Sequence, residues 1–129
     1  MSEKTIPRLS VIIPAYNEEK RIGESLDKLE AYLAGAGYAA EIIVVDDGSA
    51  DGTAGIVREK AAASSRISLL ANPGNRGKGY AVRNGMLNAT GQVRLFFDAD
   101  GSTPIDQVEK FWPLFEQEIG RASCRERVY

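Results

Sequence analysis

The sequence predicts an α/β fold in which a mostly parallel β-sheet is flanked by helices. Short apolar runs alternate along the chain with longer segments whose apolar residues recur at helical spacing. Glycine, proline, asparagine or aspartate separates one element from the next. Strands that alternate with helices form right-handed crossovers between parallel strands. A chain of 129 residues is long enough for one such domain, or for part of one.

Four apolar runs are expected to form the strands of this sheet. The second run, Ile-Ile-Val-Val at residues 42–45, is continuous and β-branched, which is typical of a strand covered on both faces. Pro14 follows the first run and predicts the end of that strand, because proline has no N–H to donate within a sheet. The expected strands are residues 9–13, 42–45, 67–70 and 93–97.

A helix is expected after each of these strands. The first is predicted by apolar residues at helical spacing from Ile22 to Leu33, and Gly35 and Gly37 end it. In the last helix, Pro104 stands at the first helical position, where proline is favoured. The expected helices are residues 22–33, 53–63 and 79–89, and a segment that begins at Thr103.

The composition indicates a soluble globular protein and gives no support to several kinds of site. Hydrophobic residues make up 43% of the chain and charged residues 26%, with a formal net charge of −2. This balance argues against a nucleic-acid partner. Histidine is absent and cysteine occurs once, so zinc sites, disulfides and Ser-His or Cys-His catalysis are not expected. No membrane span or signal peptide is recognised, and a cytoplasmic location is expected.

The last twelve residues do not continue the pattern of the rest. Their sequence, EIGRASCRERVY, contains three arginines and the only cysteine, Cys124, without apolar periodicity. It resembles the translation of a common sequencing-adapter oligonucleotide. We therefore interpret residues 118–129 as a non-native tail, give Cys124 no functional role, and expect the natural coding sequence to continue past Gln117.

Three of the four expected strands end in unusual polar sequences. Residues 14–18 read Pro-Ala-Tyr-Asn-Glu, residues 46–49 read Asp-Asp-Gly-Ser, and residues 98–100 read Asp-Ala-Asp. In open parallel sheets, ligands bind outside the carboxyl ends of the strands. The three segments are therefore expected to face one crevice.

Asp98 and Asp100 are candidate metal ligands. Side chains two positions apart on a strand point the same way. Two like charges about 4 Å apart repel by roughly 4 kcal/mol at an effective dielectric constant near 20. A divalent cation removes that penalty, and carboxylate oxygens suit Mg²⁺ or Mn²⁺. The alternative is that both aspartates cap the loop and the helix that follows.

Further candidates lie at the other strand ends. Asp47 can accept a hydrogen bond from a ring N–H of a nucleotide base, or form an Asx turn with Gly48. Tyr16 can stack on that base, or be an aromatic residue at the edge of the core. Glu18 and Glu19 can equally be acids in the first turn of a helix.

Residues 75–79, Asn-Arg-Gly-Lys-Gly, place glycines and two cations at the expected start of a helix. Backbone N–H groups and the helix dipole favour phosphate at such a position. The alternative is a solvated loop that ends in a capping glycine.

Four segments in this order, SVIIPAYNEE, EIIVVDDGSADGT, NRGKGYAVRNGM and FFDADGST, resemble the nucleotide-binding half of inverting family-2 glycosyltransferases. The family has the GT-A fold, which is Rossmann-like. The segments are most similar to the branch that contains the dolichyl-phosphate β-glucosyltransferases and the dolichol-phosphate mannose synthases. The resemblance covers residues 9–117, which it identifies as the nucleotide-sugar-binding part of a glycosyltransferase domain, truncated before its remaining half.

The resemblance also implies a role for individual residues. It places Pro14, Tyr16 and Glu18 in the nucleoside pocket, and Val45 and Asp47 against the base. It identifies Asp98, Ala99 and Asp100 as the Asp-x-Asp motif of the family, in which the two carboxylates bind the metal and the diphosphate and are the catalytic pair. It further suggests Ser102 as a metal or phosphate ligand and Lys78 as a phosphate contact.

The implied reaction is metal-dependent transfer of glucose from UDP-glucose to a polyprenyl phosphate of the dolichyl type, with inversion. The implied partners are a nucleotide-sugar donor and a membrane lipid acceptor, which would bring the protein to the cytoplasmic face of a membrane. Because the acceptor half is expected to lie beyond Gln117, the fragment is expected to be inactive alone.

Other functions remain open at this point. The same residues would serve a donor such as GDP-mannose, a saccharide hydroxyl acceptor, or a nucleotide-binding module without catalysis. A phosphoacceptor receiver domain is less consistent with the sequence. It needs its acidic pair after the first strand, whereas here the pair follows the second.

Overall fold

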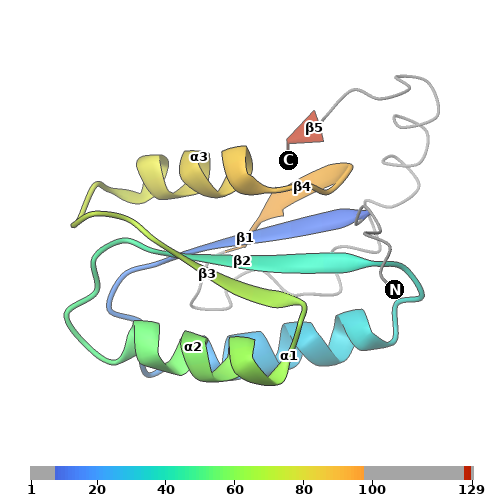
Figure 1. Ribbon diagram of the computed structural model, residues 1–129, viewed down its shortest axis with the longest axis horizontal. Coiled ribbons are helices and arrows are strands. Elements are labelled where there is room, and N and C mark those ends of the chain that lie inside the picture. Colours follow the sequence, from blue (N-terminus) through green and yellow to red (C-terminus); the bar gives the residue numbers. More distant parts are fainter. Residues whose placement is uncertain (1–7, 98–126, 129) are drawn as a thin grey trace.

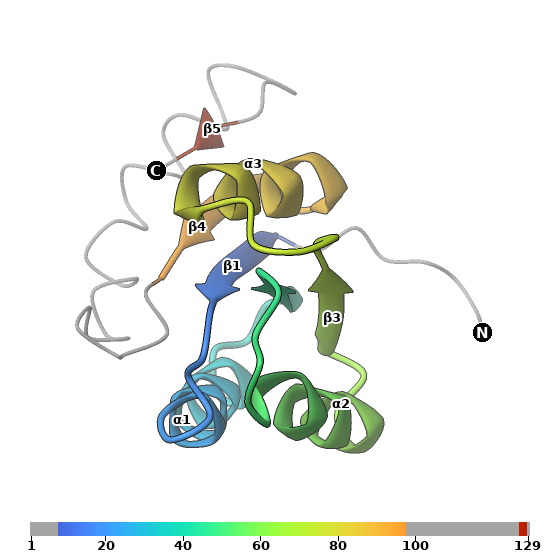
Figure 2. The same ribbon diagram turned by 90° about the vertical axis from the view of Figure 1, so that its left-hand side faces the viewer.

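The structure is a computed structural model that describes residues 8–97 and 127–128 (Figure 1). It contains a sheet of five parallel strands in the order β3-β2-β1-β4-β5. The strands are β1 (Leu9–Ala15), β2 (Ala40–Asp46), β3 (Ile67–Ala71), β4 (Val93–Phe96) and β5 (Arg127–Val128). The helices are α1 (Ile22–Ala34), α2 (Thr53–Ala63) and α3 (Lys78–Asn88). Helices α1 and α2 cover one face and α3 the other, as Figure 2 shows, which confirms the predicted fold class.

Helices α1 and α2 enclose the larger part of the hydrophobic core. The buried residues of α1 are those predicted from helical spacing, Ile22, Leu26, Leu29 and Leu33. They pack with inward-facing residues of the sheet and with Val57 of α2. Burial of one such aliphatic side chain stabilises a fold by about 1.5–3 kcal/mol. The helix ends at Gly35, as predicted.

Helix α3 packs closely against the opposite face. A Cβ atom at Gly85 would lie 2.5 Å from Ile12 Cγ2 and 3.0 Å from Val45 Cγ2. Only glycine allows the helix to approach the sheet to this distance. Ile12, Val45, Ala81 and Met86 belong to the smaller core cluster of this layer.

Strand β1 continues past Pro14 to Ala15, so the prediction that the first strand ends before the proline is wrong. Alternate residues of a strand turn their peptide groups to opposite neighbours. The carbonyl of Ile12 accepts from Phe97 N at 2.9 Å, on the side of β4. The carbonyl of Ala15 accepts from Asp47 N at 2.9 Å, on the side of β2. Pro14 therefore faces the β4 side, beyond the last paired residues of these two strands, where a missing N–H removes no described bond.

The strand order places the loops that follow β1, β2 and β3 at one edge of the sheet, here called the carboxyl edge. The chain passes outward from β1 to β2 and β3, and then crosses to the far side of β1 to form β4. A reversal of this kind opens a crevice between the loops on either side. The predicted convergence of the strand ends is thereby confirmed for β1 and β2.

The expected helix from Thr103 and the expected non-native tail both concern the part of the chain after residue 97. The helix that was expected from Thr103 lies outside the described residues. Strand β5 was not predicted, and it pairs in parallel with β4 through Val93 with Arg127 and Arg94 with Val128. The interpretation of residues 118–129 as a non-native tail stays a prediction.

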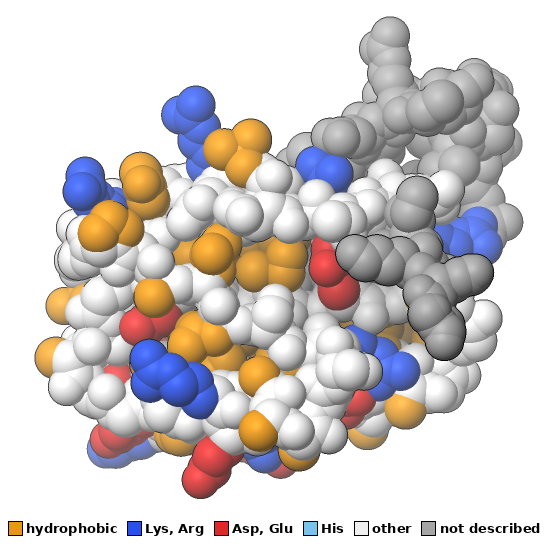
Figure 3. Space-filling view, in the orientation of Figure 1, with side chains coloured by type: hydrophobic (Ala, Val, Ile, Leu, Met, Phe, Trp, Pro, Cys, Tyr) orange, Lys and Arg blue, Asp and Glu red, His pale blue; other side chains and the backbone are white. Residues whose placement is uncertain are grey.

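Charged side chains are scattered over the surface in the orientation of Figure 3. Acidic and basic groups alternate on the described part of this face, without a large patch of one sign. This distribution agrees with a net charge near zero.

Candidate functional site

The loops after β1 and β2 are joined by hydrogen bonds between side chains and backbone. Asn17, whose φ is 54°, accepts at Oδ1 from Ala50 N at 2.8 Å. Its own N–H donates to Ser49 Oγ at 2.8 Å. Asparagine is one of the few residues other than glycine that readily take this left-handed conformation. The two bonds fix the segment that carries Tyr16 relative to the end of β2.

A second set of bonds joins the same loops at the start of α2. Thr53 Oγ1 accepts from Glu18 N at 2.8 Å and donates to Asp51 Oδ1 at 2.5 Å. Glu19 Oε1 accepts from Gly52 N at 2.7 Å. The hydrogen bond from the Thr53 hydroxyl lowers the pKa of Asp51 below its ordinary value. Glu18 and Glu19 both precede α1, so the alternative that they are acids of its first turn is wrong.

Asp47 is a buried carboxylate that bonds to the loop of residues 72–77, and only 4% of the residue is exposed. Its Oδ1 accepts from Asn72 Nδ2 and from Arg76 N, both at 2.9 Å. Its Oδ2 accepts from Gly77 N at 2.8 Å. A carboxylate offers about four acceptor positions. The described contacts fill two on Oδ1 and one on Oδ2, so one position on Oδ2 has no described donor.

These hydrogen bonds keep Asp47 ionised. Burial by itself raises the pKa of Asp47, but the N–H of Arg76, the Asn72 amide and the N–H of Gly77 together outweigh it. The positive charge of Arg76 lowers the pKa further. The pKa of Asp47 consequently lies below its ordinary value of 3.8, and at neutral pH the side chain acts only as an acceptor.

In the turn after β2, the side chain that bonds within the turn is that of Asp46. Asp46 Oδ1 accepts from Ser49 N at 3.2 Å, which is a bond within the turn. Asp47 makes its described bonds to the loop of residues 72–77 instead. The alternative that Asp47 forms an Asx turn is therefore wrong.

The turn after β2 lies directly against the loop of residues 72–77. Gly48 has a φ of 81°, and a Cβ there would lie 2.7 Å from the carbonyl carbon of Gly74 and 2.9 Å from Asn75 N. Both the backbone conformation and the contact require glycine. This close approach lets the Asp47 carboxylate reach the backbone of the loop.

Aromatic and cationic side chains are exposed around these loops. Tyr16, directly after β1, is 46% exposed. The Arg76 guanidinium lies 5.6 Å from the ring centre of Tyr80, and Lys78 Nζ lies 5.8 Å from that of Phe96. Both contacts are within the range of cation–π attraction.

Some of the remaining predicted site residues lie within the described part of the chain and others lie outside it. Pro14 and Glu18 are half-buried at the carboxyl edge, whereas Val45 is fully buried beneath α3. The Val45 side chain therefore supports this edge from below, and its contact with a base stays a prediction. Asp98, Ala99, Asp100 and Ser102 lie outside the described residues.

The described residues do not by themselves form a metal site. Within residues 8–97 no three acidic or cysteine side chains gather so that they could hold a metal ion. Asp47 is already bonded to donors of the chain. Metal binding by Asp98 and Asp100, whose oxygen donors suit Mg²⁺ or Mn²⁺, stays a prediction.

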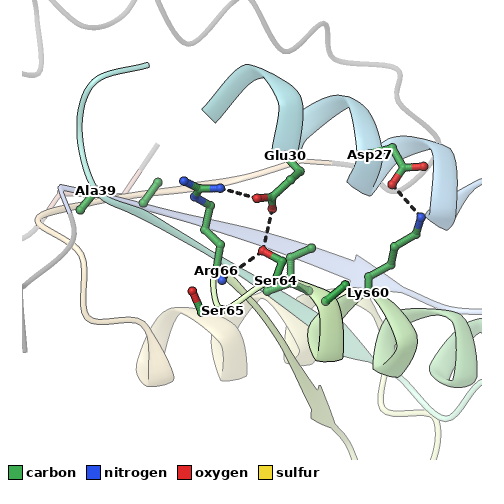
Figure 4. Close-up of a pocket in the computed structure, with 10 residues that line it drawn as sticks. Asp27, Glu30, Ala39, Lys60, Ser64, Ser65 and Arg66 are labelled. Atoms are coloured by element: carbon green, nitrogen blue, oxygen red, sulfur yellow. Dashed lines mark hydrogen bonds and ion pairs between the residues drawn. The ribbon is translucent and has the colours of Figure 1, made fainter. Parts of the chain in front are cut away.

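A polar pocket lies elsewhere, between α1, the end of α2 and the start of β3 (Figure 4). Its charged side chains pair with one another. Lys60 Nζ bonds Asp27 Oδ1 at 2.6 Å, and Glu30 accepts from both Arg66 and Ser64. These pairs join α1 to α2 and to the segment before β3, and the pocket lies away from the loops of the carboxyl edge.

The sequence did not single out several residues that build the site. Asn17, Thr53 and Asn72 hold the loops together through bonds between residues far apart in the chain. One signal was available for Asn72, because it is a polar residue two positions after the predicted strand of residues 67–70.

A doubly wound parallel sheet whose carboxyl edge carries an ionised carboxylate and exposed aromatic rings defines a nucleotide-binding class of fold. The chain belongs to glycosyl transferase family 2, whose family model matches residues 10–125.

Curated relatives extend this assignment. The dolichyl-phosphate beta-glucosyltransferase ALG5D of Trichomonas vaginalis is 46% identical over 116 residues, which cover 86% of this chain and 34% of the relative. The dolichyl-phosphate beta-glucosyltransferase of Homo sapiens is 38% identical over 110 residues, which cover 80% of this chain and 34% of the relative. The chain thus spans about a third of the length of the curated relatives it matches.

Solved structures show the same fold. The mannosyltransferase PcManGT from Pyrobaculum calidifontis, in complex with GDP-Man and Mn²⁺, is 35% identical with a TM-score of 0.63, covering 74% of this chain and 28% of that one. The glucosyl-3-phosphoglycerate synthase from Mycobacterium tuberculosis, in complex with Mn²⁺, UDP and glucosyl-3-phosphoglycerate, is 25% identical with a TM-score of 0.65, covering 84% of this chain and 40% of that one. Both similar structures are complexes with Mn²⁺ and with a nucleotide or nucleotide sugar.

The described helices are too short or too polar to cross a bilayer.

Proposed function

We propose that the protein to which this chain belongs transfers glucose from UDP-glucose to a polyprenyl phosphate of the dolichyl type, with inversion at the anomeric carbon. The observation that carries the proposal is Asp47, an ionised buried carboxylate at the end of β2 with one acceptor position left on Oδ2. Relatives named dolichyl-phosphate beta-glucosyltransferase, 38% to 47% identical to this chain, support the choice of sugar and acceptor.

In the proposed complex, Asp47 Oδ2 accepts from N3–H of uracil. A single ring N–H is sufficient to fill the position that the loop leaves open. Tyr16, which is 46% exposed, stacks on the base. Pro14 and Glu18 line the pocket beside it, and Val45 supports it from the core.

The diphosphate is proposed to lie between the start of α3 and the Asp-x-Asp segment. The N-cap of α3 is Gly77, which has no side chain to cap the helix, so the first N–H groups of α3 are proposed to bind an anion. Lys78 adds a positive charge at the same helix end. Asp98 and Asp100 would hold Mg²⁺ or Mn²⁺, which when bound would supply positive charge to the departing UDP.

The acceptor places little demand on proton transfer. A polyprenyl phosphate is already an anion, so it needs no dedicated general base to become a nucleophile. The contribution of the chain would be to position the donor and to stabilise charge on the leaving group.

A GDP-mannose donor is the second candidate. Asp47 can accept from N1–H of guanine as well as from uracil, and one similar structure was solved with GDP-Man and Mn²⁺. The two donors differ in their base, so binding of the free nucleotides distinguishes them.

Calorimetric titration of UDP and GDP into the 129-residue chain, with and without Mn²⁺, tests the proposal. The matched control is the double variant Asp98→Asn, Asp100→Asn, which keeps side-chain size and removes charge. We expect UDP to bind more tightly than GDP, in a metal-dependent manner that the control loses. Tighter binding of GDP would favour the mannose donor. If neither nucleotide binds to the folded chain or to the complete protein, the nucleotide site is refuted.

Transfer itself is measured on the complete protein, with radiolabelled UDP-glucose and dolichyl phosphate in detergent. Lipid-linked glucose is the expected product. Binding without transfer to any acceptor would leave a nucleotide-binding module and refute the enzymatic part.

A further inference from the structure

Asn72 is a buried amide directly behind the carboxylate of the proposed nucleoside pocket. It follows β3, is 6% exposed, and its backbone N–H donates to the carbonyl of Asp46 at 2.9 Å. Its side-chain Nδ2 donates to Asp47 Oδ1 at 2.9 Å. The amide is thus held by the strand end and bonded to the carboxylate.

The orientation of this amide is fixed from its other side. Asn84 of α3 donates from Nδ2 to Asn72 Oδ1 at 2.7 Å, and Asn88 donates from Nδ2 to Asn84 Oδ1 at 3.2 Å. Each amide therefore gives its N–H to the next group, and the series ends at Asp47. A reversed Asn72 amide would set its oxygen against the carboxylate and its NH₂ against another NH₂, so only one orientation is compatible with the two neighbours.

Asn72 differs from the other two donors to Asp47. Arg76 and Gly77 donate from the backbone of an exposed loop. Asn72 lies next to Ala71, which pairs with Asp46 in the sheet, so its position is set by the two strands.

We propose that Asn72 is a positioning residue for the donor site: it holds the carboxylate of Asp47 with Oδ2 toward the base, and α3 is coupled to this site through Asn84. This inference rests on the proposed function, in which Asp47 accepts a hydrogen bond from the base. Asn72 itself does not contact the nucleotide.

The pKa of Asp47 can be measured separately from the stability of the fold, so it reports on the position of this carboxylate. Apart from Asp47, the charged residues of α3, of the end of β2 and of the loops after β1, β2 and β3 are Glu18, Glu19, Lys20, Arg21, Asp46, Asp51, Arg76, Lys78 and Arg83. Asp46 bonds within its own turn and Glu18 lies 3.9 Å from Arg21. The Asn72 amide and Arg76 lower the pKa of Asp47. Loss of the amide removes one stabilising donor and shifts that pKa upward.

The test uses Asn72→Leu, which keeps the approximate shape and removes the amide, beside Asn84→Ala, which removes the group that orients it. The carboxyl ¹³C shift of Asp47 is titrated without nucleotide, and UDP affinity is measured with Mn²⁺ as a function of pH. We expect the Asp47 titration to move to higher pH in both variants. UDP affinity at neutral pH should fall about tenfold in Asn72→Leu, the lower end for loss of a group that orients a ligand-binding side chain.

The outcomes separate this inference from the proposed function. If the unaltered chain and the complete protein bind no UDP, the proposed function fails, and the ¹³C titration alone decides whether Asn72 positions Asp47. If the unaltered chain binds UDP and the variants match it in titration and affinity, the role of Asn72 is refuted. Should Asn72→Leu not fold, Asn84→Ala decides, because an unshifted Asp47 titration in that variant also refutes the coupling.

Discussion

Gly48→Ala tests the contact between the two loops that form the proposed pocket. A side chain at φ = 81° carries backbone strain of about 1–2 kcal/mol. The added Cβ would also lie 2.7 Å from the carbonyl carbon of Gly74, so the backbone must move. Overpacking of this kind costs about 1–3 kcal/mol. We expect a loss of about 2–5 kcal/mol in the free energy of unfolding.

Gly37→Ala is the matched control, because Gly37 has a φ of 82° and a Cβ added there would meet nothing within 4 Å. Both variants lose the same flexibility in the unfolded chain, so that contribution cancels in the difference. Urea unfolding followed by circular dichroism measures both. Gly48→Ala should be less stable than Gly37→Ala by about 1–3 kcal/mol, and should also bind UDP more weakly. Equal stabilities would refute the close approach of the loops.

Three further predictions concern the helix contact, the carboxylate and the distant ion pairs. Gly85→Ala should destabilise by about 1–3 kcal/mol through overpacking against Ile12, whereas Gly79→Ala, which meets nothing within 4 Å, should stabilise by about 0.5–1 kcal/mol in the same unfolding assay. Asp47→Asn should cost about 1–3 kcal/mol at neutral pH, because its NH₂ would oppose the N–H of Gly77. The pKa of Asp47 is lowered, so its contribution is present above pH 3.8 and is lost as pH falls through the folded value; unfolding curves should therefore converge below that pH. Glu30→Gln should cost at most about 1 kcal/mol, and less in high salt, because Glu30 and Arg66 are both partly exposed.

The elements of the fold were predictable because their signals are local. The spacing of Ile22 to Leu33 identified the buried face of α1, and the continuous β-branched run of residues 42–45 identified the central part of β2. Pro14 misled the prediction, because its effect depends on which neighbour its missing N–H faces. That neighbour is β4, which lies far along the chain beyond three helices and two strands, and no local pattern contains this information.

The sequence identified individual candidate residues of the site, but it did not identify the residues that form hydrogen bonds with them. Asp47 and Tyr16 were identified because they follow predicted strands, at the end of a parallel sheet where ligands bind. That Asn72 donates to Asp47 follows from the pairing of Asp46 with Ala71, which places the residues after both strands side by side. The sequence predicted both strands but not their order in the sheet, so the contact could not be derived.

A structural role and a binding role are compatible for Asp47. A carboxylate buried at a strand end stays charged only if donors surround it. Here the donors are a buried amide and two N–H groups of a loop that approaches because Gly48 has no side chain. The same bonds that hold the loop orient the carboxylate and leave Oδ2 with one open position. Under the proposed function, the donors that fold the loop also prepare the acceptor for a base, and a substitution that loosens the loop should weaken nucleotide binding without touching the nucleotide.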